Sequence, residues 1–165
     1  MEIERTYLLR GLPRFPEGAV AALLRIEQGY FADSGEGALE GRLRRTTLPD
    51  GSIRCTHTIK RGDGLVRDEV EREITEVEFE RHWPATEGRR LMKTRHVVPF
   101  GEFTWEIDEF IGLPLVLAEV ELRSAADTPP IPAWIRSEIV RDVTEEKSYR
   151  NYELALRLGS RSHSG

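Results

Sequence analysis

The chain has 165 residues, a length typical of one domain that buries about 70% of the surface exposed by its unfolded chain. It is 39% hydrophobic and 32% charged, as in a globular protein, and no apolar run approaches the roughly 20 residues of a membrane span. The formal net charge of −5 argues against a general nucleic-acid-binding protein, and the single cysteine, Cys55, excludes an intramolecular disulfide. Because the sequence starts directly with a charged strand pattern, we expect a cytoplasmic protein.

Alternating polar and apolar residues indicate strands joined by short turns over most of the chain. In chain order, strands are expected at 2–10, 27–32, 39–48, 52–60, 66–74, 91–98, 102–110 and 115–122. The connections are rich in glycine, proline and aspartate, at 33–37, 49–51, 61–64, 99–101 and 112–114. Helices are expected at 19–26, at 76–82 with Thr75 and Glu78 as a capping box, and from about 133 to 158.

Eight strands with hairpin connections predict a mostly antiparallel sheet, which can close into a barrel and so lose its free edges. The expected fold class is therefore α+β, a closed eight-stranded barrel with helices packed outside and a C-terminal helical segment. We expect one domain over residues 1–159 and a flexible tail over 160–165.

Like charges recur at alternate positions within these strands. Residues i and i+2 of a strand point to the same face, so each pair projects two like charges from one side of the sheet. In the strand at 115–122, for example, Glu119 and Glu121 share one face while the apolar residues share the other. If helices cover the apolar face from outside, the charges line the inside of the barrel. The pairs are Glu2 and Glu4, Arg42 and Arg44, Glu69 and Glu71, Lys93 and Arg95, Glu106 and Asp108, and Glu119 and Glu121.

Like charges side by side repel, so such pairs need something of opposite sign between them. Acidic pairs bind hard divalent cations through oxygen, and basic pairs bind phosphate oxygens. For any single pair, a solvated sheet face with ordinary Glu–Arg contacts is the alternative explanation. A set of pairs segregated by strand favours a polyphosphate and its metal instead.

A series of short strings carries a family resemblance over nearly the whole chain. They are Glu2-Ile3-Glu4-Arg5, Gln28-Gly29-Tyr30-Phe31, Arg42-Leu43-Arg44, Thr58-Ile59-Lys60, Arg67-x-Glu69-x-Glu71, Lys93-Thr94-Arg95, Trp105-Glu106-Ile107-Asp108, Leu117-Ala118-Glu119-Val120-Glu121-Leu122, Asp142-Val143-Thr144 and Tyr149-Arg150-Asn151. In this ordered set the chain resembles the short bacterial form of the CYTH domain, also called the triphosphate tunnel metalloenzyme family.

The resemblance implies a closed tunnel that binds a triphosphate together with Mg²⁺ or Mn²⁺. The implied metal ligands are Glu2, Glu4, Glu119 and Glu121, with Asp108 as a further candidate. The implied phosphate-binding residues are Arg42, Arg44, Lys60, Lys93 and Arg95. The implied catalytic residues are Glu2, Glu4, Lys60, Glu69 and Glu71. Of these, Glu69 and Glu71 would orient the basic side chains or assist at a second metal.

The implied activity is metal-dependent hydrolysis of a triphosphate, and the absence of a clear nucleobase pocket favours inorganic triphosphate. Thiamine triphosphatase and adenylate cyclase activity are the alternatives within the same fold. The expected partner is this small molecule, with no nucleic acid and no membrane, and the protein is expected to be a monomer or homodimer.

One position departs from the family pattern Glu-x-Glu-x-Lys, because Thr6 stands where the lysine is expected. Arg5 points to the other face of the strand, so we expect Lys147 or Arg150 of the C-terminal segment to be the nearest substitutes. The missing ammonium also leaves open a polyphosphate- or nucleotide-binding module with weakened catalysis.

Further residues outside this set have alternative roles. Trp105 and Tyr30 are expected to pack on the outside of the barrel, whereas Arg67 forms either a structural cross-strand pair or a phosphate contact. Cys55 is expected to be a buried, inert thiol.

Overall fold

The computed structural model describes residues 2–32, 40–61 and 65–164, without the side chains of 60, 61 and 162–164. The predicted loop at 33–37 and most of the turn at 61–64 lie outside these residues. The strands are β1 (Glu2–Leu9), β2 (Ala22–Tyr30), β3 (Arg42–Thr47), β4 (Ile53–Arg61), β5 (Val66–Ile74), β6 (Arg90–Phe100), β7 (Phe103–Phe110), β8 (Val116–Glu121) and β9 (Ile139–Asp142). The helices are α1 (Glu76–His82), α2 (Ala133–Arg136) and α3 (Asn151–Ser164), with 3-10 turns at Trp83–Thr86 and Lys147–Tyr149.

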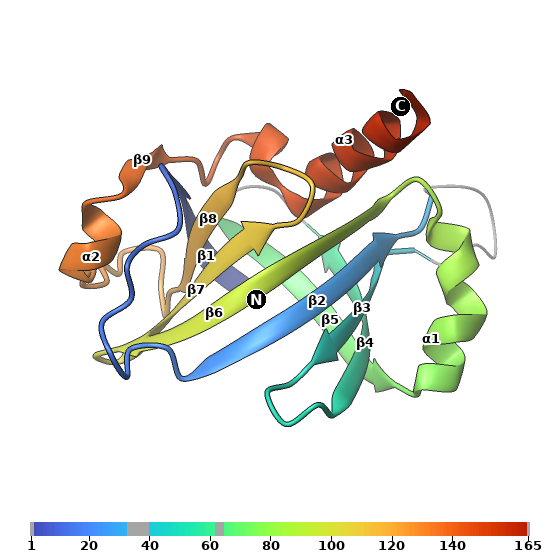
Figure 1. Cartoon of the computed structure of the whole chain (residues 1–165), viewed down its shortest axis with the longest axis horizontal. Helices are drawn as coiled ribbons and strands as arrows, with labels where there is room; N and C mark the ends of the chain where they lie inside the picture. Colours follow the sequence, from blue (N-terminus) through green and yellow to red (C-terminus); the bar gives the residue numbers. More distant parts are fainter. Residues whose placement is uncertain (1, 33–39, 62–64, 165) are drawn as a thin grey trace.

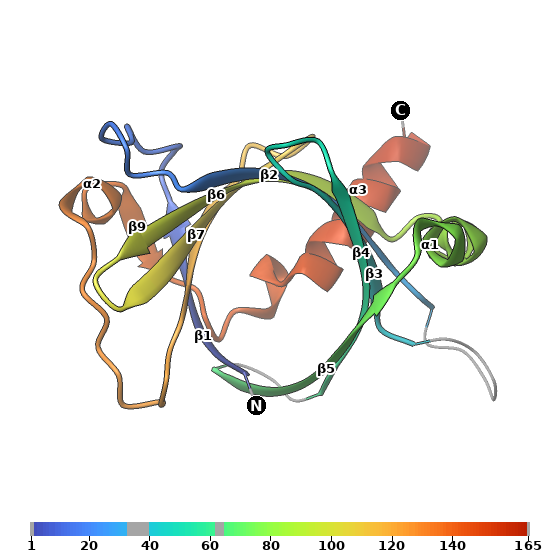
Figure 2. The same cartoon turned by 90° about the horizontal axis from the view of Figure 1, so that it is seen from below.

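The strands form an antiparallel sheet that closes on itself (Figures 1 and 2). Their order is β5-β4-β3-β2-β6-β7-β8-β1, and a further pairing of β1 with β5 completes the ring. This last pairing is a short seam, with Glu2 opposite Arg67 and Ile3 opposite Val66. The predicted closed eight-stranded barrel is therefore confirmed for the described residues, and β9 adds a short ninth strand to β1.

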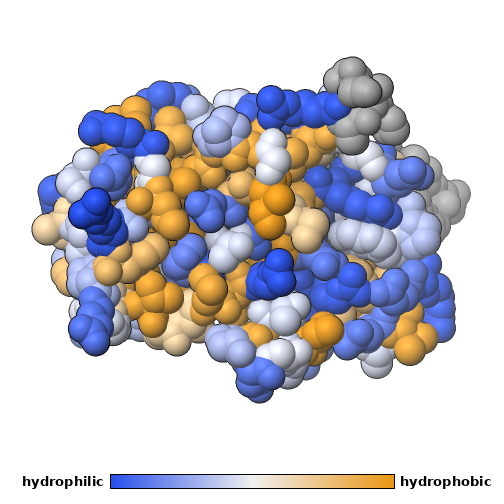
Figure 3. All heavy atoms as spheres, in the orientation of Figure 1, coloured by the Kyte–Doolittle hydropathy of each residue, from blue (hydrophilic) through white to orange (hydrophobic). Residues whose placement is uncertain are grey.

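The outward face of the barrel is apolar where helices or loops cover it. Trp105, Ile107 and Ala118 are fully buried in a cluster that includes Ile135 of α2, which confirms the outward packing predicted for Trp105. A second cluster lies beneath α1, where Cys55 packs among Leu43 and Phe79 and is buried as expected. The rest of the outer surface mixes hydrophobic and charged side chains, as Figure 3 shows for one face.

Helix α3 lies across one end of the barrel, as Figure 2 shows. Leu154 and Ala155 of this helix are fully buried against Leu91, Phe110 and Leu117. These strand residues share their sheet face with the charged pairs farther along the same strands. Apolar packing therefore closes one end of the interior, and the charged side chains line the remainder.

The predicted helix at 19–26 is wrong, because β2 begins at Ala22. The spacing of Val20, Leu23 and Leu24 resembles one face of a helix, but burial along the segment alternates with period two as far as Ile26. Hydrogen bonding to β6 from Ala22 onward, joined by hydrogen bonding to β3 from Arg25 onward, decides the conformation.

The predicted helix at 133–158 is also wrong in its middle. Residues Ile139–Asp142 form β9, which pairs with the part of β1 that β5 leaves uncovered. By contrast, α1 is confirmed with its cap, since the Thr75 hydroxyl accepts a hydrogen bond from the Glu78 amide at 3.1 Å. None of the helices in the described part of the chain combines the length and the hydrophobicity of a membrane span.

Candidate active site

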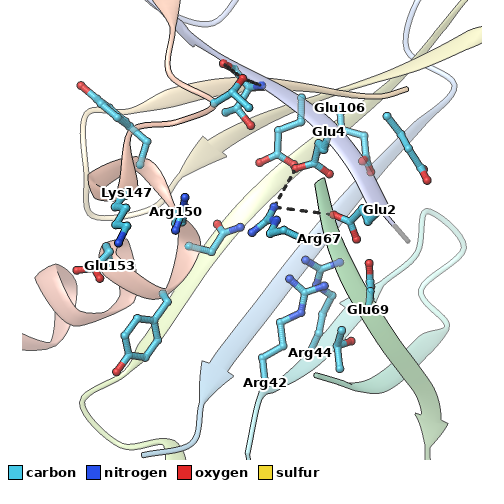
Figure 4. Close-up of a pocket in the computed structure, with 18 of the residues that line it drawn as sticks. Glu2, Glu4, Arg42, Arg44, Arg67, Glu69, Glu106, Lys147, Arg150 and Glu153 are labelled. Atoms are coloured by element: carbon cyan, nitrogen blue, oxygen red, sulfur yellow. Dashed lines mark hydrogen bonds and ion pairs between the residues drawn. The ribbon is translucent and has the colours of Figure 1, made fainter. Parts of the chain in front are cut away.

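The interior of the barrel contains a cavity of about 660 Å³, a size typical of small-molecule sites. Most of the predicted site residues line it, and Figure 4 shows several of them converging. The predicted residues in the lining are Glu2, Glu4, Arg42, Arg44, Glu69, Glu71, Arg95, Glu119, Glu121 and Lys147. Lys60 belongs to β4 and is paired with Glu69, but its side chain lies outside the described part of the structure.

One wall of the cavity is acidic, because β7, β8 and β1 are neighbours and carry carboxylates on their inward faces. The strand register places Glu4 opposite Glu121, and it places Glu119 opposite both Thr6 and Glu106. Directly opposite residues have Cβ atoms about 4.5–5.5 Å apart, so these carboxylates form a row of like charges. Glu119 is only 8% exposed, so water screens its charge poorly.

Arg67 of β5 faces this acidic wall. Its Nη2 atom lies 3.9 Å from Oε1 of Glu2 and 3.8 Å from Oε1 of Glu4 (Figure 4). Arg67 therefore forms the cross-strand pair that was one of its two expected roles, and its position in the cavity lining leaves the phosphate contact a prediction.

The wall formed by β3, β2 and β6 is basic. Arg44 donates from Nε to Oε1 of Gln28 at 2.8 Å, and Gln28 in turn donates to the Tyr30 hydroxyl at 2.6 Å. Arg42 is 6% exposed, and its buried Nε has no hydrogen-bond partner among the described residues. Burial, with added repulsion from Arg42 and Arg95, lowers the pKa of Arg44 to about 9. This wall is thus short of negative charge, which an anion would supply.

Tyr30 was expected outside the barrel, and this prediction is wrong. Tyr30 lies two residues after Gln28 in β2, so both side chains point to the inner face of the sheet, and Tyr30 lines the cavity. Its ring also packs edge-on against Tyr152 of α3, with 5.4 Å between the ring centroids. Had residues 22–30 been predicted as one strand, the alternation of side chains along it would have predicted this inward orientation of Tyr30.

Asp108 and Lys93 lie beneath the cavity surface and are absent from its lining. Asp108 is fully buried, contacts Lys93 Nζ at 2.7 Å, and accepts two hydrogen bonds of 2.8 Å from Arg95. Burial alone would raise the pKa of Asp108, but Arg95 and Lys93 outweigh it and hold that pKa far below its ordinary value. With these three contacts, the Asp108 carboxylate is already paired within the protein.

Arg95 joins the two walls. While its Nε and Nη2 atoms hold Asp108, its Nη1 lies 2.9 Å from Glu106 Oε2 and its Nη2 lies 3.8 Å from Glu119. Burial raises the pKa of Glu106, with Arg95 opposing the shift. The guanidinium is therefore fixed in orientation at the boundary between positive and negative walls.

The segment between β9 and α3 completes the cavity. Thr144 Oγ1 accepts a hydrogen bond from the Thr6 amide at 3.0 Å, and the Val143 amide donates to the Thr6 carbonyl at 2.9 Å. These bonds hold the segment against β1, so that Lys147 and Arg150 line the same cavity as Thr6 (Figure 4).

The donor set suits a hard divalent cation, since the acidic wall offers carboxylate oxygens. Within the described ranges, no three His, Cys, Asp or Glu side chains are already gathered closely enough to hold a metal ion. The described lining nevertheless contains nine acidic and six basic residues. A polyanion entering a cavity with this excess of carboxylates requires additional cations, so the residues fit a metal by chemistry and charge.

Comparison with known proteins agrees with this geometry. No family model matches the chain. Its sequence is 39% identical over 163 residues to the inorganic triphosphatase of Nitrosomonas europaea, covering 95% of this chain and 98% of that protein. The solved structure of the inorganic triphosphatase NE1496 has a TM-score of 0.59 and 34% identity, covering 94% of this chain and 95% of that one. A putative adenylate cyclase from Bacillus halodurans, 16% identical with a TM-score of 0.50 over 75% of this chain and 81% of its own, shares the fold.

The fold and cavity together define a class, the closed antiparallel barrels whose central cavity carries walls of opposite charge. The extent of its identity to the Nitrosomonas protein then gives the family: the chain belongs to the inorganic triphosphatases.

Proposed function

We propose that this protein hydrolyses inorganic triphosphate inside the barrel with the help of Mg²⁺ or Mn²⁺, as a triphosphate tunnel metalloenzyme of the CYTH type. The observation that carries the proposal is the separation of charge across one cavity, with Arg42 and Arg44 on one wall and Glu4 and Glu119 on the other. The activity named for the Nitrosomonas relative supports the choice of substrate.

The acidic wall is assigned to the metal, with Glu2, Glu4, Glu119 and Glu121 as its ligands. When bound, the divalent cation supplies charge neutralisation and polarisation of the phosphate oxygens and of the attacking water. Glu69 and Glu71 of β5 line the same cavity and are assigned a supporting role beside these ligands.

The basic wall is assigned to the phosphates. Arg42, Arg44 and Arg95 would contact their oxygens, and Lys60, Lys147 and Arg150 would add positive charge. Lys93 and Asp108 receive a different role from the one that the resemblance implied. Since both are buried in a network with Arg95, we assign them to positioning that guanidinium.

Hydrolysis then requires mainly position and charge compensation. Water attacks the terminal phosphorus, the bond from that phosphorus to the bridging oxygen breaks, and pyrophosphate and phosphate are the products. The arginines compensate the charge that develops on the departing pyrophosphate. The acidic wall provides carboxylates within the cavity to accept the proton that the water releases.

The proposal is tested by measuring phosphate release from inorganic triphosphate, ATP and thiamine triphosphate with Mg²⁺, with Mn²⁺ and with chelator, together with a cyclic AMP assay on ATP. We expect metal-dependent turnover that is fastest on inorganic triphosphate. Faster turnover of ATP or thiamine triphosphate, or formation of cyclic AMP, would reassign the substrate. Binding of triphosphate without turnover of any substrate would instead support the binding module.

A further inference from the structure

A single nitrogen atom of Arg67 lies between two carboxylates of the acidic wall. Its Nη2 is almost equidistant from Glu2 and Glu4, at 3.9 and 3.8 Å (Figure 4). Both distances exceed those of a hydrogen bond, so the attraction is electrostatic and lacks strong directional contacts. Such a cation neutralises the carboxylate pair while remaining easy to displace.

The backbone fixes this arrangement at the seam of the barrel. Arg67 is the direct cross-strand partner of Glu2 in the short pairing of β5 with β1. The side chains of Arg67, Glu2 and Glu4 are 20%, 12% and 16% exposed, so water screens their charges only partly. Without a cation between them, the two carboxylates on one face of β1 would repel each other.

The same two carboxylates are assigned to the metal in the proposed function, on which this inference rests. A divalent cation held by Glu2 and Glu4 would lie close to the Arg67 guanidinium, which contacts the same two carboxylates. Two cations in that region repel, so this position of Arg67 opposes metal entry. Arg67 also lines the cavity together with Arg150 and the basic wall, where a polyphosphate would lie.

We propose that Arg67 is a resident counter-ion of Glu2 and Glu4 in the metal-free protein, and that an incoming divalent cation displaces it toward a phosphate of the substrate. Arg67 then has opposite effects on the two ligands. It competes with the metal when substrate is absent, and it contributes to triphosphate binding once the metal is present. Metal and triphosphate therefore bind with positive coupling that passes through one side chain.

The first measurement is the affinity for Mn²⁺ in the absence of phosphate, for the wild type and Arg67→Gln. Electron paramagnetic resonance detects the Mn²⁺ that remains free. Removing the competing cation should tighten Mn²⁺ binding, by roughly fivefold to tenfold for a partly screened pair near 4 Å. Arg72→Gln is the matched control, because Arg72 lies on the same strand, faces outward and is 57% exposed beside Glu78. It loses the same charge and should leave Mn²⁺ affinity unchanged.

The second measurement is the affinity for a non-hydrolysable imidotriphosphate at saturating Mn²⁺, by calorimetry. Here Arg67→Gln should bind roughly tenfold more weakly than the wild type, as expected for loss of one charge-assisted contact. Thermal melting of the metal-free proteins checks that the barrel still forms. Tighter metal binding with weaker analogue binding is a combination that a purely structural role at the seam does not produce.

Unchanged or weaker Mn²⁺ binding in a folded Arg67→Gln variant would overturn the inference, and so would unchanged analogue binding. These failures are distinct from failure of the proposed function. A wild type that hydrolyses triphosphate with Mn²⁺ retains the proposed function whatever Arg67 does. If the wild type is inactive with every divalent cation, the proposed function fails, even if Arg67→Gln binds Mn²⁺ more tightly.

Discussion

Arg44 and Arg45 are neighbours on β3 but point to opposite faces of the sheet. Arg44 faces the cavity and carries a lowered pKa, because burial and two nearby arginines disfavour its charge. Arg45 faces outward, where it pairs with Glu27 and lies over the ring of Phe79 at 4.7 Å. One arginine is thus crowded by like charges while the next is neutralised by its surroundings.

The two arginines should therefore respond differently to substitution. Arg44→Gln is expected to weaken binding of a triphosphate analogue by about 10- to 100-fold while leaving the unfolding temperature of the free protein unchanged or higher, since repulsion is relieved. Arg45→Gln should lower the unfolding temperature and leave analogue binding unchanged. Calorimetry and thermal melting measure both. A large loss of stability with full binding in Arg44→Gln would contradict its assignment to the phosphates.

Thr6 lines the cavity close to the segment that carries Lys147, to which its backbone is bonded through Thr144. If Lys147 replaces the missing family lysine, Lys147→Ala should lower kcat by about 100-fold. Thr6→Lys in that background should restore much of the loss, because strand parity directs residue 6 into the cavity. Steady-state kinetics of the two single variants and the double variant test this. Equal losses from Lys147→Ala with and without the Thr6→Lys substitution would defeat the idea that Lys147 is the substitute.

Asp108 is the one carboxylate that neutralises two buried cations, Lys93 and Arg95, among the described residues. Its replacement by asparagine should lower the free energy of unfolding by about 3–5 kcal/mol, because Lys93 loses its buried carboxylate and Arg95 loses the most buried of its three carboxylate partners. The ordinary pKa of Asp108 is 3.8 and the folded state holds it lower, so its contribution is complete above that pH and is lost as the pH falls below it.

Urea unfolding at pH 7 and near pH 3 therefore tests how the stabilisation by Asp108 changes with pH. The difference between wild type and Asp108→Asn should be large at pH 7 and should shrink toward pH 3. Glu102→Gln, which removes a carboxylate 79% exposed beside Arg123, is the control and should have little effect. A pH-independent difference would show that the charge of Asp108 is not what stabilises the network.

Among the helices and strands, α3 both packs into the barrel and positions residues of the candidate active site. Its buried Leu154 closes one end of the barrel, and its first residue, Asn151, accepts a hydrogen bond of 3.3 Å from Lys93. Gly159 allows the helix close approach, because a Cβ there would lie 2.0 Å from the Gly88 carbonyl oxygen. The helix therefore holds the preceding residues, Lys147 and Arg150, at the cavity.

Leu154→Ala should consequently affect both stability and function. We expect a loss of about 2–5 kcal/mol from the cavity created, and an increased KM for triphosphate as the segment before α3 loosens. Val77→Ala on the outer helix α1, where the side chain is 68% exposed, should change neither. Urea unfolding and steady-state kinetics decide the matter. A destabilised Leu154→Ala variant with an unchanged KM would separate α3 from the site.

The barrel was predictable from sequence because strand alternation is a local property. The same alternation placed Glu2, Glu4 and Arg42 on the inner face. The errors arose where long-range pairing overrides local pattern. Residues 22–26 are paired with β6, and from Arg25 also with β3, while β9 pairs with the edge of β1 beyond its pairing with β5. The alternation of side chains along a strand also cannot distinguish a residue at the cavity surface from a residue beneath it. Asp108 lies beneath because Lys93 and Arg95 enclose its carboxylate.

For the whole molecule, the closed barrel makes an otherwise unfavourable arrangement possible. A ring closed by the short seam between β1 and β5 can hold rows of like charge on its inner face, because hydrogen bonding around the ring and the outer apolar clusters stabilise it. The acidic row facing the basic row gives an interior that a metal and a polyanion would neutralise together. Fold and proposed function are linked by this charge separation.

The central claim is that carboxylates of the acidic wall support metal-dependent cleavage of triphosphate. Its most direct test uses ³¹P NMR to measure the cleavage of inorganic triphosphate in the presence of Mg²⁺ by the wild type, Glu119→Gln and Glu109→Gln. Glu109 lies on β7 but faces outward and is exposed, which makes it a matched control. We predict conversion to pyrophosphate and phosphate by the wild type and Glu109→Gln, and a rate at least about 100-fold lower for a folded Glu119→Gln. Equal rates for all three proteins, or conversion that persists in chelator, would contradict the account.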